Sequence, residues 1–254
     1  MNEDYKILKD DLSAIGLRYG DSVLVHSSYK SMGGLDGGIQ TLVDALLSVI
    51  GDRGTLIVPT LTYSYVTPEE PVFDFVDTPS CVGAVSEYVR CMSGAQRSVH
   101  PTHSCAAIGF NANYYVKGHE NDRTPVGKNS PFYKLRELGG KVLMLGCDTN
   151  RNTSAHGIEE AFGTSYCLSE NFVTYKIIKP DRSYTADYRR HNIRQSGFEQ
   201  RYGRLRGVMS DEDYKGGVIH GAESYLINAP EMWKVGLECL KKDEFFLVER
   251  ASIK

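Results

Sequence analysis

The stretch DSVLVHSSYKSMGGLDGGIQTLVDALLSVIGDRGTLIVPT, residues 21–60, decides the fold class of this chain. It begins with an apolar run typical of a strand and continues through a loop rich in serine and glycine. The segment 39–50 then places apolar side chains at helical spacing and ends before Gly51, a usual stop signal for a helix. A second apolar run, TLIV, follows. This order of strand, helix and strand predicts an α/β fold.

The rest of the chain continues this alternation of apolar runs and helical segments. Residues 5–17 and 229–242 show helical spacing, and KVLML, residues 141–145, reads as a strongly apolar strand. The segment 67–80, rich in proline and acid, is expected to form a loop on the functional rim, with a helix starting near Thr78. Because open α/β sheets bind ligands beyond the carboxyl ends of their strands, the residues that follow KVLML are candidates for the site.

The composition is that of one globular domain, which we predict to span residues 1–254: 41% of the residues are hydrophobic and 24% are charged. No apolar stretch reaches the length of a membrane span, and the charged N-terminus lacks the features of a secretion signal. We therefore expect a cytoplasmic protein without a membrane partner. The net charge of −3 gives no reason to expect nucleic-acid binding. The six cysteines are widely spaced, which predicts neither disulfides nor structural zinc.

The stretch NTSAHGIEEAFG, residues 152–163, carries the most specific candidate for catalysis. His156 and Glu159 lie three residues apart, so on a helix they share one face and can interact directly. A carboxylate beside an imidazole orients the ring and favours its protonated form, as a general base requires. Structural and solvated histidines show the same spacing, so the pair alone leaves both interpretations open.

Other kinds of site have less support in the sequence. A zinc site would need a third ligand in a pattern such as HExxH, which is absent, so we expect no metal. A serine hydrolase would show GxSxG, which is also absent. Cys147 could be a nucleophile aligned with His156, or a small buried residue beside the site. The loop 26–38 could bring N–H groups close to phosphate, but it is neither a P-loop nor GxGxxG.

Taken in this order, the segments resemble the aminoglycoside N(3)-acetyltransferase family, a group of antibiotic acetyltransferases unrelated in fold to the GNAT enzymes. The matching blocks are residues 21–60, FDFVDTPSCVGAVSEYVR, RSVHPTHSCAAIG, VGKNSPFYKLRELGGKVLMLGCD and NTSAHGIEE, and the resemblance runs from about residue 5 to residue 250. It implies a single α/β domain with a mixed, largely parallel sheet flanked by helices. It also implies acetyl-CoA as cosubstrate and aminoglycoside antibiotic resistance as the function.

The resemblance also implies roles for individual residues. His156 matches the family's general base, and Glu159 follows at the family's interval. The implied reaction is direct acyl transfer, in which His156 removes a proton from the 3-amine of the acceptor while that amine attacks the thioester. The implied contacts to coenzyme A are those of Ser27, Ser28, Tyr29, Lys30, Ser31, Arg97, Ser98 and His100. The acidic residues expected near a polycationic acceptor are Asp74, Asp187 and Glu199.

A basic stretch, residues 182–206, fits an aminoglycoside acceptor poorly. It contains seven arginines, at positions 182, 189, 190, 194, 201, 204 and 206. These arginines could form a solvated basic face, attract the phosphates of coenzyme A, or bind an anionic amine such as a nucleotide-linked amino sugar. A non-catalytic protein that binds coenzyme A is an alternative to the enzyme, and a homodimer is compatible with the sequence.

Overall fold

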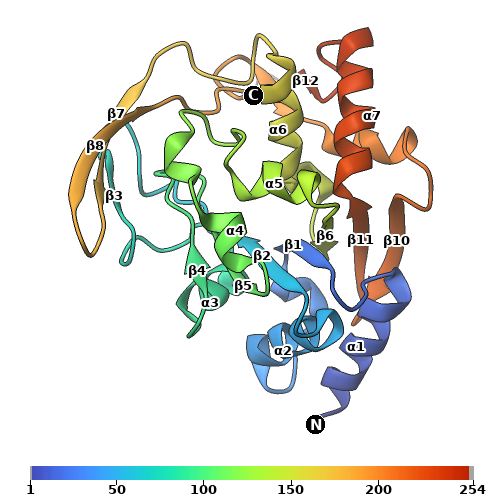
Figure 1. Ribbon diagram of the computed structural model, residues 1–254. Coiled ribbons are helices and arrows are strands. Elements are labelled where there is room, and N and C mark those ends of the chain that lie inside the picture. Colours follow the sequence, from blue (N-terminus) through green and yellow to red (C-terminus); the bar gives the residue numbers. More distant parts are fainter. Residues whose placement is uncertain (1, 252–254) are drawn as a thin grey trace.

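The computed structural model of the chain describes residues 2–251 and is built on a central seven-stranded sheet (Figure 1). In spatial order, the strands of this sheet are β10 (Tyr214–Ile219), β11 (Ala222–Asn228), β6 (Lys141–Leu145), β1 (Ser22–Ser27), β2 (Thr55–Pro59), β5 (Cys105–Gly109) and β4 (Gln96–Arg97). The sheet therefore has β1, from the stretch that opens the fold, at its centre.

Only the middle of this sheet is parallel. β1 pairs in parallel with β6 and β2, whereas β10, β11, β5 and β4 join through antiparallel pairs. The mixed α/β class is confirmed, but the prediction of a largely parallel sheet is wrong. Two of the antiparallel pairs, β10 with β11 and β4 with β5, follow from short connections without a crossover helix, whereas the pairs of β11 with β6 and of β2 with β5 join strands far apart in the sequence. In the first of these connections, His220 has a φ of 45° and Gly221 follows, so β10 and β11 form a hairpin.

Helices cover both faces of the main sheet. One face carries α1 (Glu3–Ile15), α2 (Gly38–Ile50) and α3 (Ala84–Cys91); the other carries α4 (Ala112–Val116), α5 (Pro131–Glu137), α6 (Thr153–Phe162) and α7 (Ala229–Lys242). Successive residues of β1 point to opposite layers, since Val23 and Val25 belong to the first core and Leu24 to the second. Within residues 2–251, no helix is both long and apolar enough to cross a lipid bilayer.

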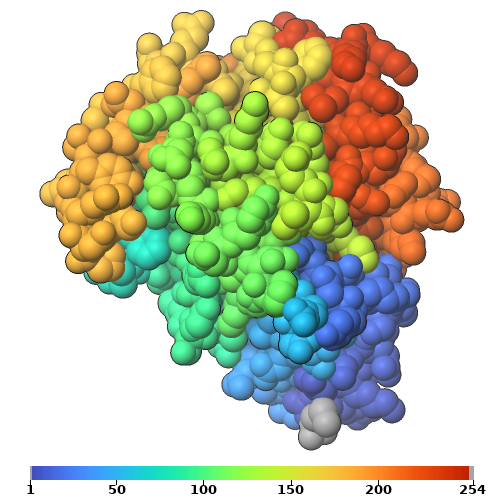
Figure 2. Space-filling model, in the orientation of Figure 1, coloured from blue at the N-terminus to red at the C-terminus, as the bar shows by residue number. Residues whose placement is uncertain are grey.

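Two small sheets lie beside the main sheet. One is built from β3 (Val72–Asp74), β7 (Val173–Ile178) and β8 (Ser183–Tyr188), and the other from β9 (Phe198–Gln200) and β12 (Val248–Arg250). In the space-filling view, the orange strands β7 and β8 form the left edge of the molecule, beside the green central segment (Figure 2). The segment 67–80 is therefore not loop alone: its strand β3 buries Phe73 in a cluster with Tyr175 and Ile177.

Most predicted elements are found within a few residues of their expected positions. α1, α2 and α7 match the three predicted helices, and β1, β2 and β6 match the predicted strands. The helix expected from Thr78 begins at Ala84 instead. Backbone hydrogen bonds from Thr78 to Asp74 and from Cys81 to Leu61 hold the intervening residues in a loop. Short 3-10 turns complete the chain at η1 (Tyr29–Met32), η2 (His119–Asn121), η3 (Thr149–Arg151) and η4 (Tyr202–Gly207).

Helix α6 begins just beyond the carboxyl end of β6. The Asn152 side chain caps its N-terminus by accepting a hydrogen bond from the N–H of Ser154, and Gly163 ends it in a left-handed conformation. Inside the helix, Gly157 lies against the Trp233 ring of α7, so close that any side chain at this position would overlap the indole. Contact between these two helices therefore fixes the segment that presents His156.

We expect Gly157→Ala to lower the free energy of unfolding by about 1–3 kcal/mol, although alanine normally favours a helix, because its methyl group would overlap Trp233. Urea denaturation would measure the change. The control is Gly207→Ala, where no atom lies near enough to meet a methyl group. Stability unchanged by Gly157→Ala would contradict the proposed packing of α6 on α7.

Candidate active site

A cavity of about 470 Å³ opens at the carboxyl ends of the central parallel strands. Ser27 ends β1, Cys147 follows β6, and Thr153 and His156 lie in the first turn of α6. The opposite wall comes from residues 190–195, which follow β8. The cavity therefore lies where the sequence placed the site, and its volume is typical of pockets for small molecules.

His156 and Glu159 form a hydrogen-bonded pair at the edge of this cavity. The His156 Nδ1 atom lies 2.9 Å from a carboxylate oxygen of Glu159, and the imidazole is 12% exposed whereas the carboxylate is fully buried. The Tyr202 hydroxyl lies 2.6 Å from the same nitrogen and donates to the same carboxylate at 2.9 Å. The hydroxyl of Tyr166 donates to the other carboxylate oxygen at 3.0 Å. Glu159 is thus held from three directions.

This network assigns the hydrogen on the His156 ring. An ionised carboxylate only accepts hydrogen bonds, so the hydrogen between His156 and Glu159 belongs to Nδ1. The Tyr202 hydroxyl hydrogen points to the same carboxylate, and burial and the Glu159 charge raise the pKa of this phenol well above its usual range. In the neutral form of this ring, the other nitrogen, Nε2, carries no hydrogen and can accept a proton. The geometry is that of a general base with an orienting carboxylate.

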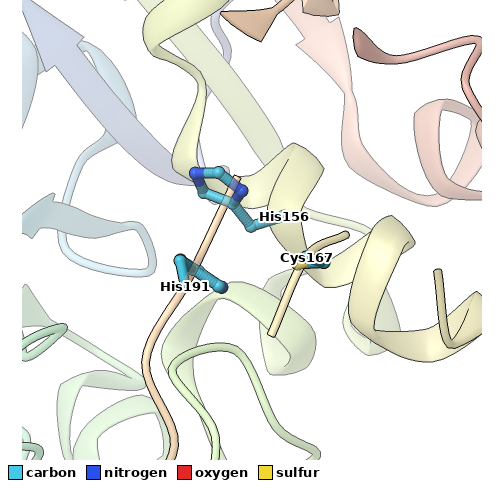
Figure 3. Close-up of side chains that lie close together, drawn as sticks. All are labelled: His156, Cys167 and His191. Carbon is cyan, nitrogen blue, oxygen red and sulfur yellow. The ribbon is translucent and has the colours of Figure 1, made fainter. Parts of the chain in front are cut away.

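A second histidine–carboxylate pair stands beside the first. His191 Nε2 lies 2.7 Å from Glu160, and the two imidazole rings of His191 and His156 have centroids 4.1 Å apart (Figure 3). Burial raises the pKa of Glu160 to about 7 and lowers that of His191 well below its usual range. His191 is therefore neutral at pH 7, and it narrows the space in which the acceptor can approach His156.

Cys167 brings a thiol close to both histidines, as Figure 3 shows, and donor atoms of His156, His191 and Cys167 lie within 4.8 Å of one another. This set could be considered for a metal. Burial and the Glu159 charge raise the pKa of the Cys167 thiol well above its usual range, and each histidine already shares one nitrogen with a carboxylate. The chemistry of these donors therefore fits proton transfer better than metal binding, and the absence of a metal stays a prediction.

Of the five predicted loop contacts to coenzyme A, only Ser27 lies on the cavity wall, and its contact with the cofactor stays a prediction. The cavity wall does not include Ser28, which precedes η1, or the η1 residues Tyr29, Lys30 and Ser31. The Ser31 hydroxyl donates instead to the carbonyl of Ser28, within its own turn. Direct contact with coenzyme A along the whole loop is therefore not supported by this geometry.

Arg97, Ser98 and His100 are buried, and their predicted contact with the cofactor stays a prediction. Arg97 donates to the carbonyls of Phe75 and Thr78, and burial lowers its pKa to about 10. The Ser98 hydroxyl lies 3.0 Å from His119, on whose ring the His100 imidazole stacks. The donors of Arg97 and Ser98 are thus engaged inside the protein, whereas His100 Nε2 is buried without a hydrogen-bond partner.

The predicted acidic contacts to the acceptor, Asp74, Asp187 and Glu199, do not line this cavity, and their roles stay predictions. Asp74 accepts hydrogen bonds from backbone N–H groups of its own turn. Asp187 is exposed on β8 and accepts from Thr174, and Glu199 pairs with Arg201. Sequence order alone could not show that these carboxylates face away from His156.

Cys147 does line the cavity, as the nucleophile alternative required. Burial and the neighbouring charge of Asp148 raise the pKa of its thiol to about 12, so it is protonated at neutral pH. A thiol in this state is a weak nucleophile. The structure therefore favours the other interpretation, that Cys147 is a small, partly buried residue beside the site.

Sequence reasoning missed Tyr202 and His191, which complete the two histidine–carboxylate pairs. Tyr202 lies 46 residues after His156 and carries no local motif. His191 directly follows two arginines, so the sequence analysis treated it as part of the basic stretch and not as a site residue. Only the return of the chain past α6 brings both side chains to Glu159 and Glu160.

Comparison with known proteins places these features in a family. The family model described as aminoglycoside 3-N-acetyltransferase matches residues 24–241. Aminoglycoside N(3)-acetyltransferase VII of Streptomyces paromomycinus is 34% identical over 174 residues, which are 60% of this chain and 58% of that protein. Aminoglycoside N(3)-acetyltransferase III of Salmonella sp is 27% identical over 264 residues, which are 93% of this chain and 91% of that protein. The solved structure of AAC-IIIb with CoASH has a TM-score of 0.80 and 25% identity, covering 94% of this chain and 96% of that one.

We expect Tyr202→Phe to reduce kcat by about tenfold, since it removes the hydroxyl that bonds to both His156 and Glu159 and so weakens the orientation of the imidazole by roughly 1–1.5 kcal/mol. KM for the thioester should change little. Steady-state kinetics would measure both, with Tyr225→Phe as the control because its hydroxyl bonds to Arg206 away from this cavity. An unchanged kcat for Tyr202→Phe would contradict the orienting role.

The buried neutral histidines make the protein sensitive to acid. Burial lowers the pKa of both His26 and His119 to about 3 from an ordinary value of 6.5. The unfolded chain therefore takes up protons near pH 6.5, which the folded chain does not. The contribution of each histidine to the free energy of unfolding is therefore fully present above this pH. It falls by up to about 1.4 kcal/mol per pH unit as the pH drops toward 3.

Urea unfolding between pH 7 and pH 4 would measure this loss, and His119→Asn should make it shallower. His220 is the control because its pKa is raised, chiefly by a hydrogen bond with Asp4. Its protonation therefore increases the free energy of unfolding as the pH falls. His220→Asn keeps the left-handed turn accessible and should not make the loss shallower. Equal slopes for wild type and His119→Asn would refute the explanation.

Proposed function

We propose that this chain, which belongs to the aminoglycoside 3-N-acetyltransferase family, transfers the acetyl group of acetyl-CoA to an amine with His156 as general base. The observation that carries the proposal is the His156–Glu159 pair, whose free Nε2 stands at a cavity of about 470 Å³. The family name implies an aminoglycoside 3-amine as acceptor and antibiotic resistance as the outcome. A cytoplasmic location and a homodimer, both expected from the sequence, belong to the same proposal.

The reaction begins with a neutral acceptor amine beside His156. Its nitrogen attacks the thioester carbonyl, a C–N bond forms, and Nε2 takes the proton that the nitrogen loses. The C–S bond of the tetrahedral intermediate then breaks, and the protonated His156 returns the proton to the departing sulfur of coenzyme A. Every proton and bond is accounted for without a covalent enzyme intermediate.

Glu159 and Tyr202 serve this cycle by controlling the imidazole. The carboxylate fixes Nδ1 as the protonated nitrogen before the reaction and stabilises the imidazolium that forms during it. The Tyr202 hydroxyl bonds to both partners, so the ring cannot rotate without breaking two contacts. Fixed donors and acceptors of this kind need little reorganisation when charge develops.

The thioester is proposed to lie near Ser27 and the N-terminal end of α6. Ser27 and Thr153 both line the cavity, and Thr153 is the first residue of α6, whose free N–H groups and positive helix end favour an oxyanion.

We expect His156→Ala to lower kcat by about 10²–10⁴-fold, the usual contribution of a general base. Release of free thiol from acetyl-CoA would measure the rate with aminoglycosides and phosphorylated amino sugars as acceptors. Titration calorimetry with coenzyme A should show that the variant still binds it.

The control variant is Cys147→Ala, which should retain activity because the thiol takes no part in the reaction. Loss of activity in Cys147→Ala with retention in His156→Ala would replace the base by a cysteine nucleophile. Binding of coenzyme A without thiol release from any amine would favour the non-catalytic alternative.

A further inference from the structure

Every charged side chain on the cavity wall is a cation. Arg151, Arg190 and Arg194, here called the arginine triad, line the cavity, and the wall formed by residues 2–251 contains no aspartate or glutamate. We infer that the acceptor amine carries an anionic group, a phosphate or carboxylate, which the arginine triad binds. The inference rests on the acetyl transfer proposed above and assigns it an acceptor class opposite in charge to the aminoglycoside that the family name implies.

The structure separates the triad from the other arginines of the basic stretch 182–206, which have partners. Arg182 lies over the Tyr184 ring, Arg189 donates to the Ser169 carbonyl, Arg201 and Arg204 pair with Glu249, and Arg206 donates to the Tyr225 hydroxyl. Within residues 2–251, the side chains of Arg151, Arg190 and Arg194 make no hydrogen bond or ion pair. Their guanidinium donors are free to bind a ligand.

The surroundings of the triad do not offset its charge. The neighbouring imidazoles are neutral at pH 7, since burial holds the pKa of His103 and His191 well below the usual range. Glu69 is an acidic residue whose pKa is affected by the Arg190 charge. Its pKa is lowered first by a hydrogen bond with Thr67 and only last by the Arg190 charge, and no ion pair joins them. A polycation entering this cavity would therefore meet three like charges.

Arginine is well suited to the anion proposed here. Its planar guanidinium can donate two parallel hydrogen bonds to phosphate or carboxylate, and such charge-assisted bonds are about twice as strong as neutral ones. Three guanidinium groups favour phosphate, with its larger charge and number of acceptor oxygens, over a single carboxylate. A phosphorylated amino sugar, including one linked to a nucleotide, has both the amine and the anion.

The position of the triad points to the acceptor rather than to coenzyme A as the source of the anion. Arg190 directly precedes His191, whose ring centroid is 4.1 Å from that of His156, and Arg151 ends η3 just before α6. An anion bound here lies close to the reacting amine. The phosphates of coenzyme A are separated from its sulfur by the whole pantetheine arm, so they would lie farther from His156.

The test compares two acceptors with the same amine, glucosamine and glucosamine 6-phosphate. Titration calorimetry with the wild-type protein should show at least about tenfold tighter binding of the phosphate, and thiol release should show the same preference in kcat/KM. The double variant Arg190→Gln/Arg194→Gln should lose this preference. The control Arg182→Gln, from the same basic stretch but off the cavity, should keep it.

Equal binding of the two sugars by the wild type, or a preference unchanged in the double variant, would overturn the inference. Preference for kanamycin over the phosphorylated sugar would overturn it as well. Because calorimetry measures binding alone, this result stands even if no thiol is released. Absence of thiol release with every amine would instead contradict the proposed transfer.

A shortened donor separates the two sources of phosphate. S-acetyl-N-acetylcysteamine carries the thioester without any phosphate of coenzyme A. If the triad binds the acceptor, the double variant should still lose its preference for glucosamine 6-phosphate with this donor. A defect seen only with acetyl-CoA, as a raised KM for that donor, would assign the arginines to coenzyme A and contradict the inference.

Discussion

The site depends on one buried carboxylate, Glu159, which is fully removed from solvent and must be satisfied inside the protein. Its partners are the imidazole of His156 and the hydroxyls of Tyr166 and Tyr202, and removing a partner from a buried charge typically costs about 3–5 kcal/mol. These bonds therefore tie two further segments of the chain, those of Tyr166 and Tyr202, to α6. The interaction that makes His156 a base also holds its surroundings together.

The sheet places this network at a ligand edge. β1, β6 and β2 are parallel and buried on both sides, so their carboxyl ends meet at one edge, where α6 begins. Gly157 lets α6 approach Trp233 of α7, and η4 brings Tyr202 to the opposite side of Glu159. A rigid interior thus presents the His156 imidazole to a cavity whose charged side chains are arginines.

Local patterns in the sequence predicted the helices, strands and short-range contacts, which depend on residues near one another along the chain. Helical spacing predicted α2 and α7, apolar runs predicted β1 and β6, and the interval of three residues predicted the His156–Glu159 contact. These patterns did not predict the long-range contacts, since no motif near Tyr202 indicates a partner 46 residues away. The contact of Arg97 with coenzyme A stays a prediction, since the sequence does not distinguish a guanidinium bonded to backbone carbonyls, as in this structure, from one that binds a ligand.

The most direct measurement of the central claim is the tautomer of His156, read from its ¹⁵N chemical shifts by NMR at neutral pH. Assignment by comparison with His156→Gln would identify the resonances. For the neutral ring, the hydrogen-bond network predicts the tautomer with hydrogen on Nδ1, bonded to Glu159, and none on Nε2. In Glu159→Gln this tautomer should lose its dominance. A ring protonated on Nε2 in the wild type would leave no acceptor for the amine proton and contradict the account.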